Sequence, residues 1–297
     1  MKLKEVWPTK SAIAHLRFLF SIFLLPVYLF ALSQAPHIIP FNAILIFLIW
    51  HLMAFPASNG YNSYFDRDEE SIGLLEKPPG VDISLYYFSL LLEVAAFLLG
   101  LLISLQFALA VLIYGIMSKL YSHRTTRLKR YPVISFLTVF IFQGCFIYWT
   151  TYAALAGIDL FSHWDSHFIL AGLICSFLIG SGYTLSQVYQ HKEDSRRGDH
   201  TLSLMLGYKG SFIFSGLMFG AGVILCFLYW KNAALLNHFY FFLLCILPTF
   251  LFFNYWFYKV NKSVSNANYR NAMLMNFISA GCMLIYFGGL VVWRFVL

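Results

Sequence analysis

Long apolar runs follow one another along almost the whole chain and are separated by short polar loops. A run of about 18 or more apolar residues is long enough to cross the hydrocarbon layer of a membrane as an α-helix. The sequence contains nine such runs, at 11–33, 38–60, 83–104, 106–121, 132–155, 166–189, 210–230, 234–258 and 271–293. It therefore predicts an all-α integral membrane protein in which nine transmembrane helices form a single bundle, with residues 1–297 as one membrane domain.

Positive charge is concentrated in the loops on one side of these runs. Counted by alternate loops, 18 of the 20 Lys and Arg residues fall on the side of the N-terminus, and only Lys231 and Arg294 fall on the other. Because cytoplasmic loops are rich in Lys and Arg, this distribution predicts a cytoplasmic N-terminus and an external C-terminus. It also accounts for the net charge of +7 without a nucleic-acid partner.

Polar and reactive side chains are rare inside the apolar runs. The first run is expected to remain as an uncleaved helix, although Ala31, Ser33 and Ala35 could form the cleavage site of a signal peptide. The five cysteines all lie in apolar runs without CxxC spacing, which predicts apolar packing rather than disulfides or a zinc site. Glu93, near the middle of the third run, is expected to face the bundle interior, either neutral and hydrogen-bonded or with a partner.

A cluster of acidic residues directly follows the second run. Within it Asn62, Asp66 and Glu70 are four residues apart, so a continuous helix would stack their side chains on one face. Carboxylate and amide oxygens, without Cys or His, suit Mg²⁺, which usually keeps positions open for water or phosphate. The cluster therefore predicts a Mg²⁺ site. The alternative is a solvated helix end whose charges only anchor the membrane span.

A second group of oxygen ligands stands four runs later, on the same predicted side of the membrane. Gln187, Gln190 and Asp194 would share a helical face at the polar end of the sixth run, with Glu193 beside them. The recurrence of such a group after the second and sixth runs indicates a weak internal duplication.

The loop between the fourth and fifth runs carries five basic residues, His123 included, within twelve positions, 121–132. Guanidinium groups pair bidentately with phosphate oxygens, so Arg127, with Lys129 and Arg130, predicts either a site for a substrate diphosphate or an anchor for anionic lipid headgroups. Arg17, near the cytoplasmic edge of the first run, has the same two interpretations, phosphate contact or a side chain that reaches out to the interface.

The first acidic cluster resembles the NDxxDxxxD motif that the UbiA family of intramembrane prenyltransferases carries after its second helix. Asn62, Asp66 and Arg67 match that motif, whereas Ser63 and Glu70 replace its first and last Asp. The family's nine-helix bundle also agrees with the predicted number and order of spans.

The second group resembles the DxxxD motif that the family carries after its sixth helix. Gln190 stands where an Asp is usual, and Glu193 and Asp194 follow it. The trailing pattern GxxTL…LG, residues 198–207, matches the family, and the basic loop YSxxxRLKRxP at 121–132 resembles the family's loop between helices four and five. Each motif alone is weak, but together they are fairly specific.

The resemblance implies transfer of a prenyl group from an isoprenoid diphosphate to a lipophilic, aromatic acceptor, with Mg²⁺ as cofactor. It implies a multi-pass protein of the bacterial cytoplasmic membrane, in contact with the lipid bilayer, and no protein partner. Asp66, Asp194, Asn62 and Glu70 would be catalytic. The implied metal ligands are Asn62, Asp66, Glu70, Gln190 and Asp194, and the implied diphosphate-binding residues are Arg67, Arg127, Lys129, Arg130 and Arg17.

Other functions remain open at this level. A transporter would use Glu93 and the polar sixth run to line a pathway, although two acid clusters on one membrane side favour an interfacial active site. A terpene cyclase of the same family would ionise the diphosphate without an acceptor. An inactive homologue would follow from Gln190, which brings an oxygen ligand but no charge.

The charge distribution predicts the membrane topology directly. A reporter fused after Leu297 should be active only outside the cytoplasm, and one inserted near Arg124 only inside, because the basic loops remain cytoplasmic. Paired fusions of an enzyme active only in the cytoplasm and one active only outside it measure this. A cytoplasmic signal from the Leu297 fusion would contradict both the nine-span arrangement and the shared side of the two motifs.

Overall fold

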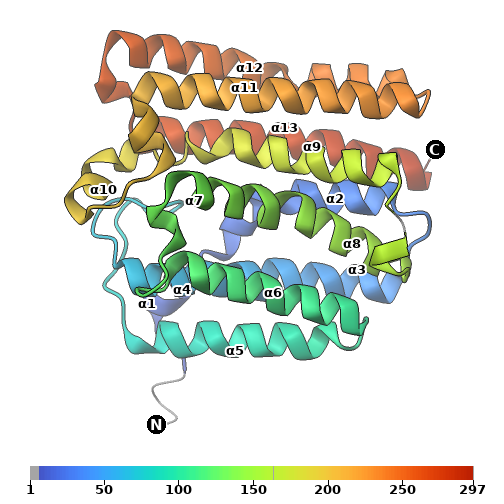
Figure 1. Cartoon of the computed structure of the whole chain (residues 1–297), viewed down its shortest axis with the longest axis horizontal. Coiled ribbons are helices and arrows are strands. Elements are labelled where there is room, and N and C mark those ends of the chain that lie inside the picture. The colour runs from blue at the N-terminus through green and yellow to red at the C-terminus, as the bar shows by residue number, and fades with distance from the viewer. Residues whose placement is uncertain (1–6, 163, 297) are drawn as a thin grey trace. The chain divides into compact units, whose positions relative to one another are not determined.

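Helices account for all the regular secondary structure of the described chain (Figure 1). The computed structural model describes residues 7–162 and 164–296, and for Arg197 only the backbone. Within these ranges no strand occurs, and the only bridge of β type joins Ile72 and Leu75 in a loop. The all-α fold predicted from the apolar runs is confirmed. Lys2 and Lys4, part of the predicted basic flank, lie outside the described residues.

Eight of the described helices are long and apolar enough to cross a membrane, and a bent pair makes a ninth if it is one span. The pair consists of Lys10–Phe23 and Leu25–Gln34, which meet at 43°. The first predicted span, 11–33, is therefore a bent pair of helices rather than one straight helix. Arg17 adopts a left-handed backbone conformation, with φ 46°, and the chain then continues as a 3₁₀ helix before α2 begins.

The helices belong to two compact units, and the first holds residues 1–24, 35–128 and 150–160. Its helices are α1 (Lys10–Leu16), η2 (Phe18–Phe23), α3 (Pro40–Phe47), the π-helix η3 (Leu48–Ala54), α4 (Phe55–Asp66), α5 (Ile83–Gly100) and α6 (Leu105–Ser122). Figure 1 shows α4, α5 and α6 side by side, and each packs against the other two. The first acidic motif ends α4.

Hydrogen bonds join the start of α1 to the segment before α5. Thr9 caps α1 by accepting from the backbone N–H of Ala12, and its hydroxyl donates to Asp82, 2.5 Å away. Asp82 in turn caps α5 by accepting from the N–H of Ser84. His15 Nε2 also lies 2.7 Å from the carbonyl oxygen of Pro79. These contacts hold the far end of the loop that begins at Arg67.

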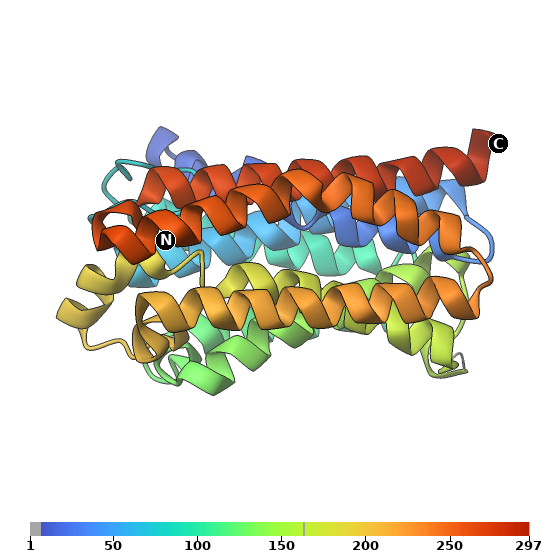
Figure 2. The ribbon, with the colours of Figure 1, turned by 90° about the horizontal axis from the view of Figure 1, so that it is seen from above.

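The second unit holds residues 25–34, 129–149 and 161–297. Its helices are α2 (Leu25–Gln34), α7 (Pro132–Val139), the π-helix η5 (Phe140–Cys145), the start of α8 (Phe146–Ala156 in full, of which residues 150–156 belong to the first unit), α9 (Ser166–Tyr183), η7 (Val188–Gln190), α10 (His191–Arg197), α11 (Leu202–Asn232), α12 (Leu236–Lys262) and α13 (Tyr269–Val296). Figure 2 shows α12 running beside both α11 and α13. The prediction that residues 1–297 form a single domain stays a prediction.

The π-helix η5 allows a close approach to α9 in the second unit. Gly144 departs from helical geometry, with φ −97° and ψ −106°. The next backbone N–H, that of Cys145, donates to Ser176 Oγ at 2.8 Å. A Cβ atom on Gly144 would lie 2.4 Å from the Cα of Ser176, so the absence of a side chain permits this contact.

Gly144→Ala should destabilise the protein, because its methyl group would collide with backbone atoms that cannot rotate away. We expect a loss of about 1–3 kcal/mol in the free energy of unfolding, the usual cost of overpacking. Gly220→Ala, in α11, is the matched control, since a Cβ there meets no neighbouring atom within 4 Å. Thermal unfolding in detergent compares the two variants. Equal melting temperatures would contradict the close approach at Gly144.

Candidate active site

The first acidic motif spans the end of α4 and the loop that follows it. α4 ends at Asp66, and Arg67 caps it in the left-handed conformation, with its N–H bonded to the carbonyl of Ser63. Asn62 and Asp66 therefore share a helical face, one turn apart, as predicted. The prediction that Glu70 continues this face is wrong, because Glu70 lies beyond the end of the helix, in an exposed stretch of the loop.

A buried serine holds the side chain of Asn62. The Oγ–H of Ser122, at the end of α6, donates to Asn62 Oδ1 at 2.9 Å. A carbonyl-type oxygen has two lone pairs, so this bond leaves room for another partner. In the sequence, Ser122 belongs only to the basic loop at 121–132 and carries no signal of a role at the site. Its contact with Asn62 depends on how α4 and α6 pack.

Asp66 lies next to a guanidinium group of the basic loop. Its side chain is only 4% exposed, and Oδ1 lies 3.8 Å from Nη1 of Arg127, whose side chain is 13% exposed. This separation makes an ion pair but is too long for a hydrogen bond. The carboxylate and the guanidinium are thus brought together with Asn62 in the same unit, 61 residues apart along the chain.

Arg17 is also docked on α4. Its Nη2 donates to the carbonyl oxygen of Asn59 at 3.4 Å, and Asn59 Nδ2 donates back to the carbonyl of Leu16 at the same distance. The guanidinium carbon lies 5.3 Å from the ring centre of Phe20. Arg17 therefore lies against the middle of α4, at Asn59, rather than extending freely to the interface.

Three arginines of the predicted diphosphate-binding set share an uncommon backbone conformation. Arg17, Arg67 and Arg127 have φ of 46°, 49° and 37°, and only Leu74 and Ala234 otherwise have positive φ among the described non-glycine residues. Left-handed geometry costs an L-residue about 1–2 kcal/mol. At Arg17 and Arg67 it ends α1 and α4, a position where Gly is usual. Such strain is concentrated at binding and active sites.

The second motif is divided among three short segments of the second unit. α9 ends at Tyr183, a 3₁₀ turn covers Val188–Gln190, and α10 begins at His191. Gln187 is therefore not on one continuous helical face with Asp194, and that prediction is wrong. Its Oε1 instead accepts from the N–H of Ser203 at 3.4 Å. Gln190 does stand at the start of α10, four residues before Asp194.

Asp194 is held by the turn between α10 and α11. Its Oδ2 accepts from the hydroxyl of Thr201 at 3.2 Å, and its carbonyl oxygen accepts from the N–H of Asp199 at 3.0 Å. Gly198, with φ 70°, ends α10 and reverses the chain. Lys129 is close enough to attract the Asp194 carboxylate.

Two further carboxylates surround Asp194. Glu193 and Asp199 are buried and close enough to repel it electrostatically. Asp199 was not among the residues predicted for the site. Asp199 stands five residues after Asp194, and residues five apart do not lie on the same face of a helix. The turn at Gly198 brings the two carboxylates close together.

The donors of both motifs suit Mg²⁺. All are carboxylate or amide oxygens, which Mg²⁺ prefers, and Mg²⁺ is usually bound by one or two carboxylates together with substrate phosphates. In the part of the chain that the structure describes, no three His, Cys, Asp or Glu side chains form a ready metal cage. Because the donors of each motif are carboxylate and amide oxygens, they fit Mg²⁺ that shares its coordination with a phosphate ligand.

The chain belongs to the UbiA prenyltransferase family, whose model matches residues 23–279. No curated protein sequence matches the chain.

Solved structures of UbiA homologues have the same fold. One, from Archaeoglobus fulgidus and bound to DMAPP and Mg²⁺, is 15% identical, with a TM-score of 0.66 over 97% of this chain and 100% of that one. The same source gave a homologue bound to GPP and Mg²⁺, 17% identical, with a TM-score of 0.62 over 95% and 99%. A structure described for digeranylgeranylglyceryl phosphate synthase is 16% identical, with a TM-score of 0.62 over 97% and 99%. The chain is thus a multi-pass membrane protein of a prenyltransferase family.

Proposed function

We propose that the protein transfers a prenyl group from an isoprenoid diphosphate to a lipophilic, aromatic acceptor, with Mg²⁺ as cofactor. The observation that carries this proposal is the cluster at the end of α4, where Asn62 and Asp66 lie beside Arg127. Oxygen ligands for a hard cation next to a guanidinium are the groups that bind a metal diphosphate. The UbiA homologues bound to DMAPP or GPP with Mg²⁺ support the same donor class.

Each motif supplies ligands to the metal in this proposal. Asn62 and Asp66 would hold Mg²⁺ at the first motif, with Glu70 contributing from its loop, and Gln190 and Asp194 at the second. When bound, Mg²⁺ neutralises the diphosphate and improves it as a leaving group. Arg17, Arg67, Arg127, Lys129 and Arg130 would bind the diphosphate oxygens and stabilise the negative charge that develops on them.

The reaction itself breaks one bond and forms another. The C–O bond between the prenyl carbon and the diphosphate breaks, and both electrons leave with the diphosphate. A carbon of the aromatic acceptor then bonds to the allylic cation and gives its proton to the released diphosphate or to water, which restores the aromatic ring. The arginines and lysine hold the diphosphate in place, and the surrounding apolar helices keep water from the cation. We place this chemistry at the cytoplasmic side of a bacterial membrane, where the basic loops are predicted to lie.

The purified protein, incubated with isoprenoid diphosphates of graded chain length and a panel of aromatic acceptors, tests the proposal. We expect diphosphate release that requires both Mg²⁺ and acceptor, together with a prenylated product. Release without an acceptor, with a cyclic hydrocarbon product, would indicate a terpene cyclase instead. No release with any donor would contradict the proposal.

Removing one carboxylate from either motif should nearly abolish transfer. Asp66→Asn and Asp194→Asn each keep the side-chain shape but remove a negative charge from the proposed metal ligands, so we expect a loss of at least about a hundredfold. Glu76→Gln is the control, because this exposed carboxylate lies in the loop after α4 but outside the ligand set. Initial rates over a Mg²⁺ titration compare the variants. Full activity of the Asp66→Asn variant would contradict the metal–diphosphate mechanism.

Substitutions in the basic loop should weaken the binding of the isoprenoid diphosphate donor. Lys129→Ala or Arg130→Ala should raise the KM for the donor about tenfold or more, since a hydrogen bond to a charged group contributes about 1.5–3 kcal/mol. Arg124→Ala, an exposed residue of the same loop, is the matched control and should leave KM unchanged. If all three variants keep the KM of the unmodified protein, Lys129 and Arg130 are headgroup anchors.

A further inference from the structure

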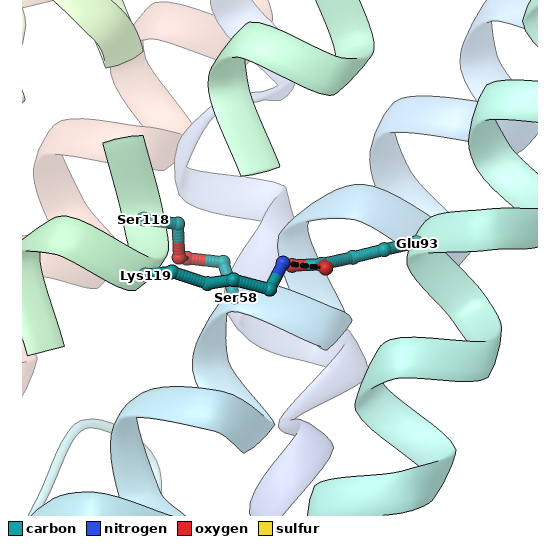
Figure 3. Close-up of polar contacts among 4 residues, drawn as sticks. All are labelled: Ser58, Glu93, Ser118 and Lys119. Atoms are coloured by element: carbon teal, nitrogen blue, oxygen red, sulfur yellow. Dashed lines mark hydrogen bonds and ion pairs between the residues drawn. The ribbon is translucent and has the colours of Figure 1, made fainter. Parts of the chain in front are cut away.

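The membrane-spanning part of the first unit contains one ion pair that the proposed chemistry does not use. Lys119, in the last turn of α6, is paired with Glu93, in the middle of α5 (Figure 3). Their side chains are 30% and 15% exposed. Ionisable groups at this depth are rare and are usually functional, since each must be compensated by a partner. The charge distribution counts Lys119 among the basic residues of the cytoplasmic side. The sequence alone does not identify a partner for Glu93.

Lys119 touches the turn of α4 that carries Asn62. Its Nζ lies 5.5 Å from the ring centre of Tyr61, the residue before Asn62, and Tyr61 is only 4% exposed. An ammonium over an aromatic face is attracted by the ring. Lys119 therefore connects α6 to α4 through Tyr61 and to α5 through Glu93.

Two hydrogen bonds join α4 and α6, one on each side of Lys119. Together they fix how far the two helices are shifted along each other. Ser58 and Ser118 are 2.6 Å apart through their hydroxyl oxygens, next to the ion pair in Figure 3. One turn further, Ser122 donates to Asn62. Both helices advance by four residues between these contacts. A shift or rotation of α6 would therefore break both, and one of them is the hydrogen bond that holds the side chain of Asn62.

We propose that Lys119, anchored by Glu93, is a positioning residue for the metal-binding amide of Asn62. The pair holds α6 in the rotation that presents Ser122 to Asn62, and so keeps the amide oxygen directed for a cation. This inference rests on the proposed function, because it assigns Asn62 to the metal. A residue that only stabilises the fold would lower the melting temperature and leave cation affinity unchanged.

Binding of Mn²⁺ to the purified, full-length protein, alone and with inorganic diphosphate to supply the phosphate ligands, tests this without depending on catalysis. Mn²⁺ takes the same oxygen ligands as Mg²⁺, and its free concentration is read by electron paramagnetic resonance. We expect Lys119→Met and Glu93→Gln each to raise the Kd for Mn²⁺ about tenfold, and the charge-swapped double variant Glu93→Lys/Lys119→Glu to restore much of the loss. Ser122→Ala should weaken binding to a similar extent, because it removes the final contact.

A neutral double variant and a distant control separate positioning from stability. Glu93→Gln/Lys119→Met leaves no unpaired charge in the membrane, so it should fold even where a single variant does not, yet still bind Mn²⁺ weakly. Lys231→Met, which removes an ammonium 5.9 Å from the ring of Phe227 in α11, should bind Mn²⁺ as the unmodified protein does. A folded neutral double variant with the unmodified Kd would overturn the positioning role.

The two proposals fail in different ways. If the unmodified protein binds Mn²⁺ and the variants weaken it, but no prenyl diphosphate is cleaved, the proposed function is wrong and the positioning of Asn62 stands. If Mg²⁺-dependent transfer occurs while every variant of the pair binds Mn²⁺ normally, the positioning role is wrong and the proposed function stands.

Discussion

Hydrocarbon offers no hydrogen bonds, so every backbone N–H and C=O inside the membrane must be satisfied by the chain itself. This constraint explains why the described structure is helical throughout, and it leaves few places where the backbone can depart from a helix. Arg17, Arg67 and Gly198 depart from it, each in a left-handed conformation at the end of a helix. The two acidic motifs lie beside these points, because a helix end is where side chains of distant segments can converge.

The same constraint governs polar side chains within the spans. Ser58 pairs with Ser118, Trp50 donates to Thr151 at 3.1 Å, and Glu93 pairs with Lys119. Each contact joins two helices, so satisfying the polar group also sets how the helices are rotated. A polar network of this kind specifies one packing arrangement more strongly than apolar contacts, which tolerate small rotations. In the first unit such contacts surround the helix that carries Asn62 and Asp66.

Much of the chemistry could be predicted from residue types and spacing. Asn62 and Asp66 share a face because they stand four residues apart within one helix. Glu70 and Gln187 were expected on the same helical faces as the other ligands. That expectation continued the helical period past the points where α4 and α9 end. At Arg67 a left-handed residue stops α4, and after Tyr183 the chain changes to turns and a 3₁₀ segment. Both breaks occur at residues that are not glycine or proline, so the sequence carries no strong signal for them.

The sequence by itself determined that the chain is a helical membrane protein, because the hydrophobic effect and the length of each apolar run leave no other way to cross a bilayer. It also determined which residues could bind a metal diphosphate, since that depends on side-chain chemistry. Only the tertiary structure decided that Ser122 bonds to Asn62, that Arg127 faces Asp66, and that Glu93 pairs with Lys119. These contacts join residues from 26 to 61 positions apart, and they depend on helix rotation and register, which packing between helices sets.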